Sequence, residues 1–334
     1  MKSLIYTLVA PHTLALVEND IEWPPIHGDG ILCETIISGI SPGTELAAWN
    51  GENPLRPSGG YPRKIGYQNI AKVIDISGGD GRIQKGDRVY TNQSHCSKFS
   101  CKEEEVLAII PKDKHVKDYI FSYMYHMALC ALSINCNQKT ISREQRIAVF
   151  GGGALGCSIV EVAKLLGYSV LQISDSKHLA KLQPSTNQII SRKEFKMQFG
   201  KASEFNNCIV TTNRWDDYDS SLSTCLSNGT IVLVGFPGRD GSLPSTNPFE
   251  PKHFYLNKLK ICSLPGERRD PFASHEVDLS IFESMNDIVL KISQGLFGQT
   301  FSESRIVEYE DLEKAYRALS SNRNNQVSLS VNWS

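Results

Sequence analysis

The arrangement of apolar and polar positions divides the chain into two kinds of segment. Through residues 1–115 the apolar runs are short, and turn residues such as Pro24-Pro25 and Gly78-Gly79 interrupt them repeatedly. Frequent turns between short runs are typical of an all-β region, and they predict a partly closed barrel. Over residues 146–262 strand-like runs alternate with helical patterns. This alternation predicts the parallel sheet of an α/β fold.

The same pattern places individual elements. A helical pattern covers 118–132, and two more cover 279–294 and 310–321, with a last strand near 326–333. The parallel segment contains five predicted strands, at 146–150, 169–174, 207–212, 229–235 and 258–263. With 334 residues the chain exceeds the size of one ordinary core, so the sequence predicts two domains.

The first strand of the parallel segment ends in a glycine-rich turn. Residues 146–156 read Arg-Ile-Ala-Val-Phe-Gly-Gly-Gly-Ala-Leu-Gly, with the spacing GxGxxG. These glycines allow a sharp turn, a close approach of a pyrophosphate to the backbone, and tight packing of the following helix. Free amides at the start of that helix bind the anion. We therefore predict that a dinucleotide binds to Gly151, Gly153, Ala154, Leu155 and Gly156. The alternative is a strand–turn–helix that binds no ligand.

The ends of two later strands extend the predicted cofactor site. Thr211-Thr212 and Gly235-Phe236 each follow an apolar run. In an open α/β sheet, ligands bind beyond the carboxyl ends of the strands, so both pairs are expected to face the cofactor. The alternative is that these residues only begin a turn.

The residues after the second strand bear on the choice of cofactor. A carboxylate at this strand end favours NAD(H), whereas a small residue with nearby cations accommodates the extra phosphate of NADP(H). Counting from Gly156 places Asp175 at the position that contacts the ribose. Counting from Gly167 places Ser174 at that position instead, with Lys177 close by. The sequence favours NADP(H) slightly, because two serines and a lysine flank the site.

Composition and charge narrow the class of protein. A net charge of −1 provides no attraction for nucleic acid or for an anionic membrane. The short run Met1–Ala10 lacks a small-residue cleavage site, and we interpret it as a first strand rather than a signal peptide. No segment approaches the length of a membrane span. Nine scattered cysteines without a Cys-x-x-Cys pair favour reduced thiols, and so a cytoplasmic protein.

Several further segments, in their order and spacing, carry a resemblance to a known family. They are a loop from Ser38 to Glu45, Gly66-Tyr67-Gln68, Gly86-Asp87-Arg88-Val89 and the helical Ala128–Leu132. Together with the glycine turn they resemble the medium-chain dehydrogenase/reductase family along nearly the whole chain. The sequence Ser-Pro-Gly-Thr-Glu at 41–45 is similar to the branch that includes bacteriochlorophyllide dehydrogenase-like proteins.

This resemblance implies an α/β protein with a GroES-like, β-rich catalytic domain and a Rossmann domain that contains a doubly wound parallel sheet. The catalytic domain would comprise residues 1–120 and 264–334, with the Rossmann domain, residues 121–263, inserted. The active site would lie in the cleft between them. The resemblance also implies a homodimer that pairs through the edge strand near 258–263.

The positions that hold a catalytic zinc in many relatives carry unsuitable residues here. The resemblance places the first ligand at Ser41-Pro42, the next two at Tyr67 and Gln68, and the last at Tyr123. Zinc prefers thiolate, imidazole or carboxylate ligands. His95-Cys96 lies in a short loop without a third ligand. The sequence therefore predicts no metal.

Without zinc, hydroxyl groups must stabilise charge on the substrate oxygen. Thr44 matches the hydroxyl that relays a proton in zinc-dependent relatives. Tyr67 and Tyr123 take the positions of metal ligands, and a phenol can donate a hydrogen bond or act as a general acid. All three are catalytic candidates, with packed tyrosines and a turn-stabilising threonine as the alternatives. Glu45 is expected to pair with a structural arginine.

The leading hypothesis is a zinc-independent, NAD(P)-dependent oxidoreductase that transfers a hydride between nicotinamide and a secondary alcohol/ketone pair. One alternative is an enone or quinone reductase of the same fold, which reduces a carbon–carbon double bond. Another is a non-catalytic nucleotide-binding protein. The expected partner is a small-molecule substrate, not nucleic acid or a membrane.

Overall fold

The protein, seen in a computed structural model, divides into two compact units. Unit 1 comprises Met1–Tyr123 and Ile281–Ser334, and unit 2 comprises Met124–Ser280. The end of unit 2 includes a short antiparallel pair, β15 (Arg268–Arg269) with β16 (Asp278–Leu279). The structure describes residues 1–25, 28–55, 59–134, 145–176, 179, 188–200, 202–239, 241–244, 246–247, 249–264, 268–269, 278–321 and 328–334.

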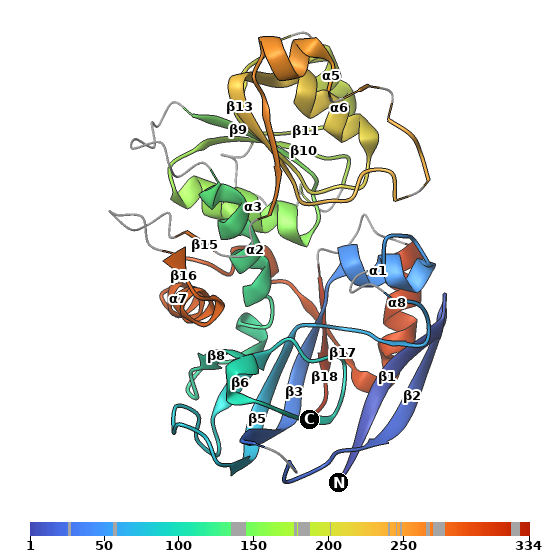
Figure 1. Ribbon diagram of the computed structural model, residues 1–334, viewed down its shortest axis with the longest axis vertical. Coiled ribbons are helices and arrows are strands. Elements are labelled where there is room, and N and C mark those ends of the chain that lie inside the picture. Colours follow the sequence, from blue (N-terminus) through green and yellow to red (C-terminus); the bar gives the residue numbers. More distant parts are fainter. Residues whose placement is uncertain are drawn as a thin grey trace. The chain divides into compact units, whose positions relative to one another are not determined.

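Unit 1 is rich in β-structure, as predicted (Figure 1). Its larger sheet has the order β17-β18-β3-β5-β6-β8, with β7 paired to β3. The strands are β3 (Gly30–Ile40), β5 (Asn69–Ser77), β6 (Arg88–Thr91), β7 (Lys98–Cys101), β8 (Val106–Ile110), β17 (Arg305–Glu308) and β18 (Leu329–Asn332). A second sheet has the order β2-β1-β4, formed by β1 (Lys2–Ala10), β2 (Thr13–Asp20) and β4 (Arg63–Lys64).

Helices connect these sheets. They are α1 (Pro42–Asn50), α2 (Ser122–Ser133), which continues into unit 2, α7 (Ile281–Ser293) and α8 (Leu312–Ser321). Single helical turns are η1 (Glu103–Glu105), η2 (Val116–Asp118), η4 (Gln299–Phe301) and η5 (Tyr309–Asp311). Helix α1 forms where a loop was expected, because Pro42 supplies a helical φ at the first position and Gly51, at φ 76°, ends the helix.

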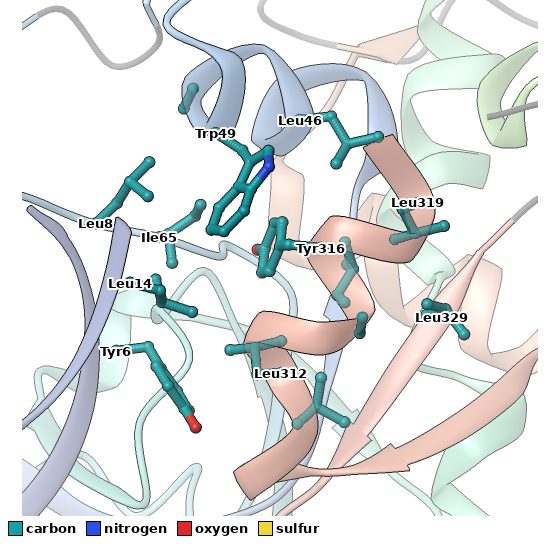
Figure 2. Packing of buried hydrophobic residues seen from close by; sticks show 14 residues of the cluster. Tyr6, Leu8, Leu14, Leu46, Trp49, Ile65, Leu312, Tyr316, Leu319 and Leu329 are labelled. Atoms are coloured by element: carbon teal, nitrogen blue, oxygen red, sulfur yellow. The ribbon is translucent and has the colours of Figure 1, made fainter. Parts of the chain in front are cut away.

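A hydrophobic cluster joins α1 and α8 to the smaller sheet (Figure 2). Trp49 of α1 and Tyr316 of α8 are each 1% exposed or less, and their rings stack with centroids 5.5 Å apart. Tyr6, Leu8 and other apolar side chains complete the cluster. The cluster therefore fixes α1, which carries the candidate Thr44, against a helix from the far end of the sequence.

Unit 2 contains a six-stranded parallel sheet of order β11-β10-β9-β12-β13-β14. The strands are β9 (Arg146–Phe150), β10 (Ser169–Ile173), β11 (Gln188–Ile190), β12 (Phe205–Val210), β13 (Cys225–Leu233) and β14 (Lys260–Ser263). Among the described residues the helices are α3 (Ala154–Leu165), α5 (Arg192–Phe199), α6 (Trp215–Thr224) and the π-helix η3 (Lys252–Leu256). This is the 3-2-1-4-5-6 order of the Rossmann fold. Strand β14 lies at one edge, and the dimer expected there stays a prediction.

The predicted strands of unit 2 match the observed ones to within a few residues. Strand β11 was missed because it has only three residues. No helix in the part of the chain that the structure describes is long and apolar enough to cross a membrane.

Candidate active site

The turn between β9 and α3 has the geometry that its glycines predict. Gly151 has φ 129°, and a Cβ atom there would lie 2.2 Å from Thr211 Oγ1. A Cβ at Gly156 would lie 2.4 Å from the carbonyl oxygen of Gly151, so the helix packs directly against the turn. Around Gly153, in contrast, a Cβ would meet no atom within 4 Å. The turn is therefore closed on its inner side and open at Gly153.

The start of α3 presents backbone amides without competing side chains. Gly153 is the N-cap residue, and it makes no side-chain capping bond. Ala154, Leu155 and Gly156 form the first turn, where amides have no partner within the helix. These amides and the positive end of the helix suit an anionic group that approaches the open side of Gly153. The residues thus fit the pyrophosphate of a dinucleotide.

The predicted residues at later strand ends lie beside this turn. The backbone amide and the hydroxyl of Thr211 both donate to the carbonyl of Phe150, each over 2.9 Å. Gly235 approaches Thr212 closely, since a Cβ at Gly235 would lie 2.0 Å from the carbonyl oxygen of Thr212. Phe236 follows Gly235, and its backbone amide donates to Oδ1 of Asn213, which follows β12, over 3.0 Å. These strand ends are tied to one another next to the glycine turn.

Ser174 and Asp175 point to different neighbours. Ser174 is buried, and its Oγ lies 2.4 Å from the position of a Cβ at Gly152, so it faces the glycine turn. The carboxylate of Asp175 accepts hydrogen bonds from the amide of Arg192 over 3.0 Å and from its Nη1 over 2.8 Å. Lys177 lies outside the described residues.

Arg192 was missed by the sequence analysis and organises this corner of unit 2. It forms a two-point ion pair with the buried Asp217, over 2.7 and 2.8 Å, in addition to its bonds with Asp175. Burial raises the pKa of Asp175, but the hydrogen bonds and charge of Arg192 outweigh this effect and hold that pKa below its ordinary value. Asp175 is therefore already bound to a cation, which it shares with Asp217.

A pocket of about 540 Å³ opens beside this ion pair. Its lining includes four cationic and two anionic side chains, Arg192, Lys193, Lys196, Arg214, Asp175 and Asp216. The sequence contains an indication of this pocket, because two adjacent cations, Arg192 and Lys193, occupy the first turn of α5. The helix dipole disfavours cations at that end, so their presence there calls for a nearby anion.

In unit 1 the structure brings the three predicted catalytic residues together. The hydroxyl of Tyr67 donates to Ser41 Oγ over 2.6 Å and also hydrogen-bonds the side chain of Thr44. The ring of Tyr123 lies edge-on to Tyr67, with centroids 5.9 Å apart. Thr44, Tyr67 and Tyr123 are all half-buried. We refer to Ser41, Thr44, Tyr67 and Tyr123 as the hydroxyl cluster.

The hydroxyl cluster consists of neutral donors. Burial raises the pKa of the Tyr67 phenol above its ordinary value of 10.0, although the hydrogen bond with Ser41 opposes the shift. Gln68, at another of the ligand positions, is fully buried, and its Oε1 accepts from Tyr90 over 3.4 Å. Such groups are poor ligands for Zn²⁺. Among the described residues, no three His, Cys, Asp or Glu side chains are placed to hold a metal ion.

Glu45 does not pair with an arginine as expected. Its carboxylate lies 3.0 Å from His95 Nε2 and accepts a hydrogen bond from the hydroxyl of Tyr316. The expectation was wrong because sequence distance hides both partners: Tyr316 is 271 residues away in the chain. His95, discounted as a metal ligand, is thus part of a buried hydrogen-bond network next to the hydroxyl cluster.

Comparisons with known proteins agree with this architecture. No protein-family model matches the chain. It is 34% identical over 96 residues to 2-desacetyl-2-hydroxyethyl bacteriochlorophyllide A dehydrogenase of Cereibacter sphaeroides, a match that covers 29% of each protein. It is 22% identical over 320 residues to an alcohol dehydrogenase of Geobacillus stearothermophilus, covering 83% of this chain and 92% of that one.

Solved structures share the fold over almost the whole chain. L-Idonate 5-dehydrogenase of Escherichia coli superimposes with a TM-score of 0.75 at 16% identity, covering 99% of this chain and 98% of that one. Staphylococcus aureus TarJ in complex with NADPH gives 0.75 at 14% identity, and a short chain alcohol dehydrogenase (RspB) of E. coli complexed with NADH gives 0.76 at 14% identity. Each of these two matches covers 99% of both chains.

These likenesses establish the fold predicted from the sequence, a GroES-like domain with a Rossmann domain. Together with the sequence matches they support the resemblance to the medium-chain dehydrogenase/reductase family.

Proposed function

We propose that the protein is a zinc-independent, NAD(P)-dependent oxidoreductase that transfers a hydride between nicotinamide and a secondary alcohol/ketone pair. The observation that carries this proposal is the open glycine turn at Gly153, at the end of the first strand of a 3-2-1-4-5-6 sheet. The names of the similar proteins, which are dehydrogenases, support the reaction class, and the NADPH and NADH of TarJ and RspB support the cofactor.

Each unit has a separate task in this proposal. In unit 2 the amides at the start of α3 bind the pyrophosphate, and the nicotinamide, when bound, supplies or accepts the hydride. In unit 1 the Tyr67 phenol holds the proton that the substrate oxygen needs. Ser41 and Thr44 orient the Tyr67 hydroxyl, since both hydrogen-bond to it. In the reducing direction the Tyr67 hydroxyl would turn from Ser41 to the substrate oxygen and give it its proton as the carbonyl carbon accepts the hydride. The hydroxyls of Ser41 and Thr44 would then donate to the phenolate that is left.

Zinc independence is proposed from the chemistry of the donors. The ligand positions of zinc-dependent relatives hold Ser41, Tyr67, Gln68 and Tyr123, and the Tyr67 phenol is kept neutral by burial. A neutral phenol is a hydrogen-bond donor and general acid, not a good ligand for Zn²⁺. The hydrogen bond from this phenol takes the place of a Lewis acid at the substrate oxygen.

Two features of unit 2 support a preference for NADP(H). Asp175, the carboxylate that would select the ribose of NAD(H), is already bound by Arg192. The adjacent pocket carries more cationic than anionic side chains, and Lys193 extends into it from an exposed position. An additional phosphate on the ribose would be attracted to these cations.

The test is a fluorescence titration with NADPH and with NADH, followed by turnover of a panel of ketones and enones. We expect tighter binding of NADPH and reduction of ketones. Lys193→Gln should weaken NADPH binding by roughly tenfold, which corresponds to the loss of one charge-assisted contact, and leave NADH binding unchanged. Lys72→Gln, which removes another exposed lysine, is the control. Tight cofactor binding without turnover of any substrate would favour a non-catalytic binder.

A further inference from the structure

A buried carboxylate lies directly behind the hydroxyl cluster. Glu45 is 2% exposed, and its Oε1 accepts the backbone N–H of Ser41 over 2.7 Å. Its Oε2 accepts from the hydroxyl of Tyr316 and lies 3.0 Å from His95 Nε2. His95 and Tyr316 have no exposed surface. A buried carboxylate is costly unless such donors surround it, so the network must form as a whole.

The network extends beyond Glu45 to the end of the chain. Trp333 Nε1 donates to Ser38 Oγ over 2.9 Å, and Ser38 Oγ lies 2.7 Å from His95 Nδ1. The other ring nitrogen of His95, Nε2, is directed at Glu45. The Glu45 carboxylate thus lies at the centre of a continuous chain of hydrogen-bonded groups.

Glu45 makes a bond similar to the reciprocal half of a capping box, in which an acidic side chain near the helix start accepts the backbone amide of the N-cap residue. Ser41 is the N-cap of α1, yet its side chain makes no capping hydrogen bond. A serine at this position normally uses its hydroxyl to accept a backbone amide of the first turn. Here Glu45 reaches back to the amide of Ser41 and holds the helix start. The Ser41 hydroxyl, which caps no amide of the helix, accepts from Tyr67 instead.

We propose that Glu45, His95 and Tyr316 are positioning residues, which fix Ser41 and through it the hydroxyl of Tyr67 for proton transfer to the substrate oxygen. The role in catalysis rests on the proposed function. The network links the cluster to α8, so the C-terminal part of the chain controls the geometry of a site that is otherwise built from its N-terminal part.

The first test compares two tyrosines from one hydrophobic cluster, both visible in Figure 2. Tyr316→Phe keeps the ring stacked on Trp49 and removes one donor to Glu45. Tyr6→Phe removes a buried hydroxyl that donates to the carbonyl of Tyr309 over 2.7 Å, outside the network. We expect kcat to fall about tenfold for Tyr316→Phe, the size of one hydrogen bond to a charged group, with the KM for NADPH unchanged. Tyr6→Phe should retain the kcat of the wild type.

The second test does not depend on activity. Tyr316→Phe and Tyr6→Phe are each combined with Tyr67→Phe, and the melting temperatures are measured. Coupled residues lower the melting temperature non-additively. The decrease in the Tyr316/Tyr67 double variant should therefore differ from the sum of the two single decreases by roughly 2 °C or more. The Tyr6/Tyr67 pair should be additive. If Tyr316→Phe does not fold, Ser38→Ala, which removes the hydrogen-bond partner of His95 Nδ1, replaces it in both tests.

The outcomes separate the two proposals. Additive melting temperatures for the Tyr316/Tyr67 pair would overturn the positioning network, and so would equal kcat values for Tyr316→Phe and Tyr6→Phe. A wild-type protein that reduces no substrate, but shows the coupling, would contradict the proposed function and retain the network.

Discussion

The glycine turn of unit 2 and the hydroxyl cluster of unit 1 are built in opposite ways. The turn comprises six consecutive residues, 151–156, and its geometry follows from the lack of side chains at close contacts. The cluster combines Ser41, Tyr67 and Tyr123, and Glu45 behind it depends on Tyr316 from another helix. A binding function can thus be recognised from a local motif, whereas the catalytic geometry exists only after folding.

The two regions also differ in what a substitution removes. In the turn, an added methyl group creates a steric conflict with the backbone or with a bound ligand. In the cluster, a removed hydroxyl deletes one hydrogen bond at nearly constant volume. Substitutions in the turn should therefore affect binding, and substitutions in the cluster should affect turnover.

The largest effect is expected from a matched pair of alanines in the turn. Gly156→Ala places a Cβ 2.4 Å from the Gly151 carbonyl oxygen, so it should abolish measurable NADPH binding and lower the melting temperature. Gly153→Ala has open space and φ −83°, so its melting temperature should equal that of the wild type. Its NADPH affinity should still fall at least about tenfold, because only a ligand meets the methyl group. Wild-type affinity in Gly153→Ala would place the dinucleotide elsewhere.

A smaller effect, confined to turnover, is expected in the hydroxyl cluster. Tyr67→Phe removes the proposed proton donor and should lower kcat about 100-fold, the usual cost of one donor to a developing charge. The Kd for NADPH should not change. Tyr61→Phe, whose hydroxyl donates to the carbonyl of Ala48, is the control and should keep full turnover. Full activity of Tyr67→Phe in steady-state assays would exclude this phenol as the donor.

Much of the fold was predictable because its signals are local. Apolar parallel strands such as β9 are buried over all but the first residue, and their pattern predicts bounds close to those observed. Gly167 follows α3 at φ 84°, as its place after the helical pattern predicts. The sequence predicts a loop in place of helix α1, because the segment has few apolar positions and the residues that stabilise it lie in α8.

The site was predictable only in part. The glycine turn depends on neighbours in sequence, and Thr44, Tyr67 and Tyr123 were found through a family resemblance that aligns distant positions. The bonds of Glu45 with His95 and Tyr316, and of Arg192 with Asp217, join residues that no sequence pattern connects. The fold decides which donors surround a buried carboxylate, so these three pairings could be seen only in the structure.

The most direct measurement follows the transferred hydrogen itself. The protein is incubated with ketones and with enones, in the presence of NADPH in which both hydrogens of the reactive nicotinamide carbon are deuterium, and the products are analysed by mass spectrometry. Our account predicts a secondary alcohol with one deuterium on the carbon that bore the oxygen. Unlabelled alcohol, or deuterium delivered only to the alkene carbon of an enone, would contradict it.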